Sequence, residues 1–109
     1  MAVYVDDARN AFGRMIMCHM LADTLDELHA MAEKIGMKAS WYQPLSFPHY
    51  DVCQMRRVLA IEHGAIQVDR RQIVHIKRRL RMDKQFISQV LERHTQACLP
   101  LPVFAARPI

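Results

Sequence analysis

Three helix-start signals, each followed by apolar residues at helical spacing, constrain the fold of this chain more than any other feature. Thr24 begins a Thr-x-x-Glu capping box, in which the hydroxyl accepts a backbone N–H and the glutamate reaches back. Asp51 and Asp69 stand in equivalent N-cap positions before two further apolar stripes. Gly36 and Gly64 follow the first two stripes, where a left-handed residue commonly ends a helix. The pattern predicts helices over residues 25–35, 52–63 and 70–81, and a fourth near 84–94.

Short apolar runs between these helices predict strands. Residues 2–5 are mostly β-branched or aromatic and stop at two aspartates. Residues 15–21 are apolar except for one histidine, and residues 66–68 form a third, shorter run. Residues 7–14 read as a loop. We therefore expect a single α/β domain over residues 2–94, with a small sheet of two or three strands packed against three or four helices. Two prolines predict an extended C-terminal tail over 95–109.

Composition narrows the class of protein. A chain of 109 residues that is 51% hydrophobic is long enough for one core. The three cysteines are widely spaced and odd in number, which argues against a disulfide framework or a thiolate zinc site and favours a reducing cytoplasm. The sequence contains no glycine-rich phosphate loop and no G-x-S-x-G elbow. No signal peptide and no apolar stretch of about 20 residues is evident, so we expect no membrane association.

Charge is divided unequally along the chain. Residues 1–51 carry four Lys/Arg against seven Asp/Glu, a net charge of −3, whereas residues 52–109 carry eleven against four, a net charge of +7. Residues 70–81 are the most basic segment, with six Lys/Arg around a narrow apolar stripe. Such a helix can contact nucleic acid, dock an acidic protein partner, or form ordinary solvated surface. The candidate contacts for nucleic acid or phosphate in this segment are Arg70, Arg71, Lys77, Arg78 and Arg81.

Carboxylates and imidazoles at the ends of predicted elements suggest a polar site. Asp6 and Asp7 close the first strand, His19 lies in the second, and His49 and Asp51 come directly before the second helix. These groups bind divalent metal ions and also act as general acids and bases. We therefore predict catalytic roles for His19, His49 and Asp51, and a divalent metal ion held by Asp6, His49 and Asp51.

Each of these residues also has a purely structural interpretation. Asp51 can serve only as an N-cap, which stabilises a helix by about 1 kcal/mol. His19 can be a core histidine with both ring nitrogens satisfied, and Asp6 and Asp7 can simply begin a turn. Half of the eight aromatic residues fall within positions 41–50. They can stack on bases, or they can cover one edge of the core.

Several short motifs carry a resemblance to a known family. The motifs are YVDD at residues 4–7, ELHA at residues 27–30 and HYDV at residues 49–52. Over about residues 2–68 the chain resembles an uncharacterised domain-of-unknown-function family of small bacterial and phage proteins. The resemblance implies a shared polar site that includes equivalents of Asp6, His19, His29, His49, Asp51 and Arg56, without naming its chemistry. Residues 69–109 lie outside the resemblance.

Together these features predict a phage or bacterial accessory protein that binds or acts on nucleic acid or a nucleotide. In this hypothesis Arg56 holds a phosphate, and the basic helix supplies general electrostatic attraction. If the protein is an enzyme, metal-assisted phosphoester hydrolysis is the reaction class that the predicted site favours. The alternative is a non-enzymatic inhibitor or adaptor that binds a protein through its basic helix or its C-terminal tail.

Overall fold

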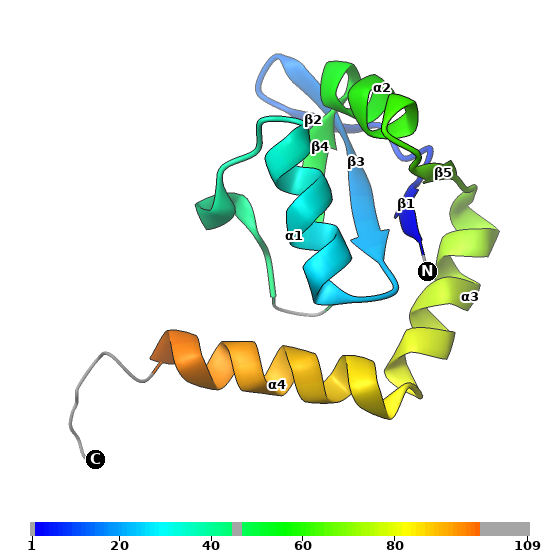
Figure 1. Cartoon of the computed structure of the whole chain (residues 1–109). Helices are drawn as coiled ribbons and strands as arrows, with labels where there is room; N and C mark the ends of the chain where they lie inside the picture. Colours follow the sequence, from blue (N-terminus) through cyan, green and yellow to red (C-terminus); the bar gives the residue numbers. More distant parts are fainter. Residues whose placement is uncertain (1, 45–46, 99–109) are drawn as a thin grey trace.

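The computed structural model describes residues 2–44 and 47–98, with side chains up to residue 92, as a mixed sheet with helices on both faces (Figure 1). The strands are β1 (Val3–Val5), β2 (Asn10–Phe12), β3 (Met15–Ala22), β4 (Tyr50–Cys53) and β5 (Ile66–Gln67). The helices are α1 (Leu25–Lys34), α2 (Gln54–Glu62), α3 (Arg70–Arg81) and α4 (Lys84–Cys98), with a short 3₁₀ helix η1 (Ala39–Trp41). The expectation of an α/β fold is confirmed.

The long strand β3 organises the sheet. Met17 pairs with Asn10 of β2 and with Cys53 of β4, so these two strands flank β3 on opposite sides. Met20 likewise lies between Val5 of β1 and Tyr50 of β4. β1 and β2 therefore share one edge of β3, each along half of its length, and β4 occupies the other edge. β5 pairs in parallel with β1.

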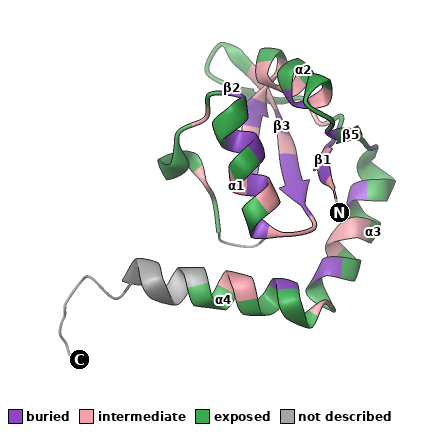
Figure 2. Cartoon of the chain, in the orientation of Figure 1, coloured by how far each residue is buried: buried purple, intermediate pink, exposed green. Residues whose placement is uncertain are grey.

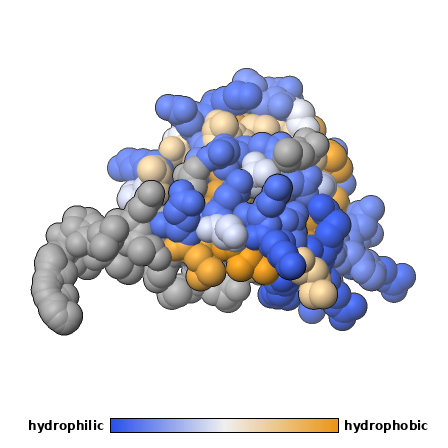
Figure 3. Space-filling view, turned by 60° about the horizontal axis from the view of Figure 1, so that its bottom comes forward, coloured by the Kyte–Doolittle hydropathy of each residue, from blue (hydrophilic) through white to orange (hydrophobic). Residues whose placement is uncertain are grey.

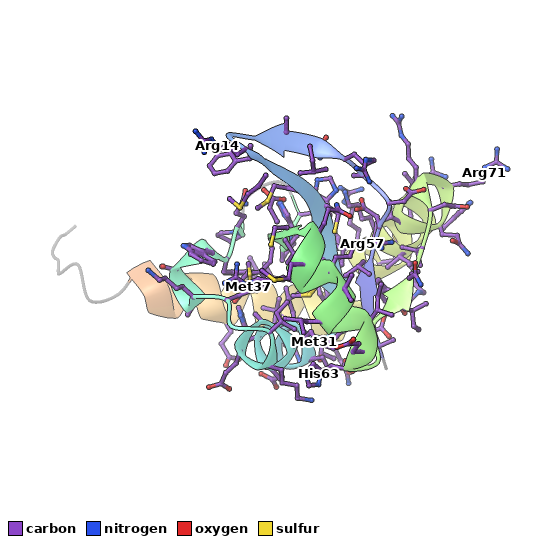
Figure 4. All side chains as sticks on the ribbon, turned by 90° about the horizontal axis from the view of Figure 1, so that it is seen from above. Arg14, Met31, Met37, Arg57, His63 and Arg71 are labelled. Carbon is purple, nitrogen blue, oxygen red and sulfur yellow. The ribbon has the colours of Figure 1, made fainter. Side chains whose placement is uncertain are left out.

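The two faces of the sheet are buried to different extents. On one face, the cross-strand pairs Cys18 with Val52 and Met20 with Tyr50 are all buried. The Tyr50 hydroxyl lies 2.7 Å from Nδ1 of His29 in α1, which places α1 over this face. Figures 1 and 4 show α2 beside α1 on the same side of β3, and Figure 2 colours parts of α1 and β3 purple, as buried. This is the main hydrophobic core.

The opposite face is covered at one end only. Tyr4 and Leu21 are paired and lie on this face, and the Tyr4 hydroxyl accepts a hydrogen bond of 3.2 Å from Arg79 of α3. Phe86 of α4 stacks on Phe47 with 5.6 Å between ring centroids. α3 and α4 thus pack against the β1 end of this face. Because side chains alternate along a strand, His19 and Met17 continue the same face beyond the helices, and both are partly exposed.

Two of the three predicted helix starts are confirmed with their caps. Thr24 accepts a hydrogen bond from the backbone N–H of Glu27, but the Glu27 carboxylate accepts from the Thr24 hydroxyl and not from its backbone N–H as predicted. Asp69 forms a full capping box with Gln72. The prediction that Asp51 caps a helix is wrong. Asp51 lies inside β4, and the N-cap of α2 is Cys53, whose side chain makes no capping bond. Pairing with β3 buries Tyr50 and Val52, and this non-local gain outweighs the local cap signal.

Over residues 2–44 and 47–98 the sheet contains five strands, where the sequence indicated two or three. β2 lies in the segment predicted as a loop, and β4 lies where a connection and a helix start were expected. Both strands are only three or four residues long and gain their stability from β3, so local propensity gives little signal for them. α4 continues to Cys98, past the predicted end near 94, and the rest of the predicted tail, 99–109, lies outside the described residues.

Candidate functional site

A hydrogen-bonded carboxylate and imidazole form the base of the site. Asp6 follows the last residue of β1 and stays in register with β3, donating its backbone N–H to the carbonyl of His19 at 3.1 Å. Its side chain is buried. Oδ1 accepts hydrogen bonds from the backbone N–H groups of His19 (2.8 Å) and Ala8 (3.2 Å), and Oδ2 lies 2.7 Å from His19 Nδ1. Both carboxylate oxygens are therefore committed, and His19 is held in one orientation.

The two groups shift each other's ionisation. Burial opposes ionisation of Asp6, but hydrogen bonds from the His19 side chain and backbone and from Ala8 outweigh it and lower the pKa of the carboxyl. The hydrogen bond to Asp6 raises the pKa of His19 against the opposing effect of burial, and the Asp51 charge adds to the rise. A carboxylate that fixes Nδ1 and stabilises the imidazolium leaves Nε2 free to exchange a proton.

A second imidazole and carboxylate face this free nitrogen. Asp51 Oδ1 lies 4.0 Å from His19 Nε2, beyond hydrogen-bonding distance, and 3.3 Å from His49 Nε2. Gln43 donates a hydrogen bond of 2.7 Å to Asp51 Oδ2. His49 Nδ1 lies 2.6 Å from the carbonyl oxygen of Phe47, which can only accept, so Nδ1 is the donor. The His19 and His49 rings meet edge to face at 5.6 Å.

The structure thus brings together four residues that the sequence singled out: Asp6, His19, His49 and Asp51. These side chains form a row, because the His19 ring lies between the carboxylates of Asp6 and Asp51. Asp7, the fifth candidate, is exposed and is not part of this row. The predicted metal ligands Asp6, His49 and Asp51 do not gather around one point. Among the residues that the structure describes, no group of three or more His, Cys, Asp or Glu is placed to hold a metal ion.

An open pocket of about 560 Å³ lies beside His19 and Asp51. The β2–β3 hairpin, η1 and the chain after α1 form its apolar wall, with Phe12, Met15, Met17, Met37, Trp41 and Tyr42. Its polar lining includes His19, Gln43, Asp51 and Arg56. Figure 4 shows Met37 on the side of the molecule where η1 lies and Arg14 at the far turn of the hairpin. The exposed rings of Phe12 and Trp41 make this pocket suitable for a flat, apolar group.

The predicted basic residues occupy three different places. Arg56 lines the pocket, donates to the carbonyls of Ile35 and Gly36, and lies 5.4 Å from the Trp41 ring centroid. Lys77 and Arg81 lie over the buried Phe47 ring, at 5.9 and 5.5 Å from its centroid. Arg70, Arg71 and Arg78 line a separate hollow on the outer side of α3.

The sequence did not indicate several residues of the site. Gln43, which holds Asp51, lies in the aromatic connection and is joined to His49 by an isolated β-bridge. Arg57 of α2 donates a hydrogen bond of 2.9 Å to the Asp6 carbonyl. The signal that could have revealed the geometry is the alternation of polar and apolar residues over 49–53, which places His49, Asp51 and Cys53 on one face of a strand.

The two cysteines whose side chains the structure describes differ in their exposure. Cys18 is buried and free, and burial raises the pKa of its thiol to about 12. Such a thiol is inert at neutral pH. Cys53 is free and partly exposed in the pocket wall.

Fold and site together define a small mixed α/β protein in which an aspartate and a histidine form a hydrogen-bonded pair beside an aromatic pocket. The chain belongs to the family described as protein of unknown function (DUF4031), whose model matches residues 3–80. The match extends past residue 68, where the resemblance was expected to end, and includes α3 as far as Leu80. No curated protein and no solved structure matches the chain. Within the described ranges, no helix is long and apolar enough to span a membrane.

Proposed function

We propose that the pocket binds a nucleotide or a nucleotide unit of nucleic acid, and that His19 acts on its phosphoester as a general acid and base. The observation that carries this proposal is the Asp6–His19 pair, with a 2.7 Å contact at Nδ1 and with His19 exposed to the pocket. The carboxylate keeps the imidazole oriented and compensates the positive charge that it gains on taking a proton.

The shape and charge of the pocket support a nucleotide as the ligand class. A base is flat and apolar on its faces, and Phe12, Trp41 and the neighbouring methionines present such a surface. Lys38 and Arg56 lie within 6 Å of the Trp41 ring and place positive charge beside it for a phosphate. Gln43 and Asp51 supply hydrogen-bonding groups at the polar side of the pocket, where they can contact the edge of a base or a sugar hydroxyl.

The reaction that fits these groups is hydrolysis of a phosphoester. A water molecule attacks phosphorus while His19 Nε2 accepts its proton. The bond from phosphorus to the leaving oxygen then breaks, with the electron pair staying on that oxygen, and the imidazolium returns the proton to it. Asp51, held by Gln43 and His49, lies on the side of His19 from which the water approaches and accepts a hydrogen bond from it. A positioned acid–base group of this kind contributes roughly 10² to 10⁴-fold in rate.

The test is a turnover assay on nucleoside monophosphates, cyclic nucleotides and short oligonucleotides, comparing the wild type with His19→Gln. We expect His19→Gln to lose at least about 100-fold in kcat/KM. The matched control is His63→Gln, which removes an exposed histidine at the end of α2, away from the pocket. Equal activity of His19→Gln and the wild type, or no turnover of any of these compounds by the wild type, would refute the proposed reaction.

The second candidate is a non-enzymatic inhibitor or adaptor that binds through the basic helix. The exposed arginines on the outer side of α3 favour it, because they lie apart from the pocket. In that case His19→Gln leaves the function of the protein intact, whereas substitution of those arginines abolishes it. The C-terminal tail, the other surface considered from sequence, lies largely outside the described residues.

A further inference from the structure

The outer side of α3 is a strongly cationic surface separate from the pocket. Five exposed residues line a shallow hollow of about 540 Å³, which we call the α3 outer surface: Arg70, Arg71, Val74, His75 and Arg78. Figure 3 shows hydrophilic residues projecting from the side of the molecule that α3 forms, and Figure 4 shows Arg71 pointing away from the body. The helix contains no acidic residue, and the flanking Asp69 is occupied as its cap.

The basic residues of α3 differ in what they contact. Arg79 forms an ion pair of 2.7 Å with Asp23 and contacts the Tyr4 hydroxyl, so it anchors the helix to the sheet. Within the described part of the chain, Arg70, Arg71 and Arg78 make no ion pair or hydrogen bond through their side chains. Three exposed guanidinium groups without partners are not needed to hold the helix in place, because Ile73 and Leu80 are already buried beneath it.

The chemistry of this surface favours phosphate over an acidic protein. A guanidinium group presents a planar fork of donors that matches two phosphate oxygens. A stable protein interface needs an apolar centre, and Val74 is the only large apolar side chain that lines this hollow. A nucleic-acid backbone needs no such centre, because counterion release supplies much of the affinity.

Positive charge continues from this surface to the candidate site. Lys77 lies on the Phe47 ring, two residues before His49, and its charge acts on His19, where it lowers the pKa of the imidazole against the raising effect of Asp6. Arg81 lies on the same ring. The helix has 12 residues, so it is about 18 Å long at 1.5 Å per residue, which exceeds the length of one nucleotide. Arg70 and Arg78 of the α3 outer surface are eight residues apart, about 12 Å along the helix, so a ligand that contacts both of them and the pocket is longer than one nucleotide, as a polymer is.

We propose that the α3 outer surface binds the phosphate backbone of single-stranded nucleic acid, and that a polymer rather than a free nucleotide is the substrate of the candidate site. This inference rests on the proposed function, because a base must enter the pocket. A paired base is stacked inside a duplex and cannot enter, whereas a single strand presents it without the cost of unpairing. The strand would cross α3, pass Lys77 and Arg81, and place one nucleotide beside His19.

The test compares two double variants with equal loss of charge. Arg71→Gln/Arg78→Gln removes two cations from the α3 outer surface, and Lys34→Gln/Lys84→Gln removes two exposed cations elsewhere. Binding of a fluorescently labelled 12-nucleotide oligothymidylate is measured by anisotropy over a range of salt concentrations. For single strands each phosphate contact contributes about 0.7 to the slope of log K against log salt, so the first variant should reduce the slope by about 1.4. Its affinity should fall on the order of tenfold, and the lysine variant should match the wild type.

Three results would overturn the inference: equal effects of the two variants, a 12-base-pair duplex that binds as tightly as the single strand, or polyglutamate that displaces the oligonucleotide as well as unlabelled oligothymidylate does. Turnover of thymidine monophosphate, measured beside oligonucleotide binding, separates this inference from the proposed reaction. One outcome is monophosphate turnover that depends on His19 and is unaffected by the arginine variant, with no tighter binding of the oligonucleotide. That result would refute the polymer as substrate and leave the proposed reaction standing. The other outcome is oligonucleotide binding that depends on the arginines, without any turnover. That result would refute the proposed reaction and leave nucleic-acid binding by the α3 outer surface standing.

Discussion

Replacing Asp6 with Asn tests the Asp6–His19 pair with the smallest change in shape. Asparagine keeps an oxygen that can accept the backbone N–H groups of His19 and Ala8, so the turn after β1 is preserved. It removes the negative charge and places an NH₂ donor opposite His19 Nδ1. The ring must then accept at Nδ1, which excludes the imidazolium in the wild-type orientation. Asp6→Asn should therefore lower the pKa of His19 and destabilise its protonated form.

The size of the effect follows from the hydrogen bond and its exposure. A hydrogen bond to a charged group contributes about 1.5–3 kcal/mol, and the His19 side chain is 31% exposed, so we expect the low end of this range, about 1.5 kcal/mol. The size of this destabilisation depends on pH through two groups, His19 and Asp6. The raised pKa of His19 gives stability that is complete below its ordinary value of 6.5 and lost as pH rises through the folded-state pKa. The lowered pKa of Asp6 gives stability that is present above 3.8 and lost on further acidification through the folded-state pKa. The destabilisation should be largest between about pH 4 and 6.5.

Urea unfolding of the wild type and Asp6→Asn at pH 5.5 and at pH 9 measures this difference, and an NMR titration of the imidazole carbons reports the pKa of His19 directly. The control is Asp7→Asn, since Asp7 is the adjacent carboxylate but is exposed. The reasoning fails if Asp6→Asn is no more destabilising at pH 5.5 than at pH 9, if the pKa of His19 does not fall, or if Asp7→Asn gives the same result.

Three further substitutions test how the elements around the site are held. Thr24→Ala removes the α1 cap and should cost about 1 kcal/mol in thermal or urea unfolding, whereas Thr24→Ser should restore most of it. Phe86→Ala removes a ring that is 5% exposed and stacked on Phe47, and it should cost about 3–5 kcal/mol; a loss under 1 kcal/mol would mean that α4 does not pack there. Arg79→Ala should cost about 0.5–1 kcal/mol, because its ion pair with Asp23 is half exposed, and Arg78→Ala should be neutral; equal losses would show that the ion pair does not anchor α3.

The sequence predicted the helices well because their signals are local. The Asp69 capping box and the Thr24 cap both occur where the side-chain spacing placed them, since each depends on groups no more than three residues apart. Gly36 and Gly64 adopt φ angles of 79° and 102°, the left-handed conformation that ends α1 and α2. The second helix was predicted too early because Asp51 has the form of a cap but belongs to a strand.

The short strands could not be predicted because their stability comes from distant partners. β2 and β4 gain their hydrogen bonds from β3. The intrinsic β-strand propensity of three or four residues is too small to be recognised in the sequence. The pairing of His19 with Asp51 in this register is what places both side chains on one face. A shift of one residue would turn Asp51 toward the core and leave no site.

The order of residues along the chain is enough to predict the three principal helices, the division into an acidic and a basic half, and the histidines and aspartates that are candidates for a site. The folded chain is needed to show that the His19 ring lies between Asp6 and Asp51, and that Arg79 of α3 anchors the fold while Arg70, Arg71 and Arg78 face solvent. The difference arises because capping and amphipathic periodicity act over a few residues, whereas a site made from β1, β3 and β4 exists only after chain segments as far apart as residues 6 and 51 pair in one sheet.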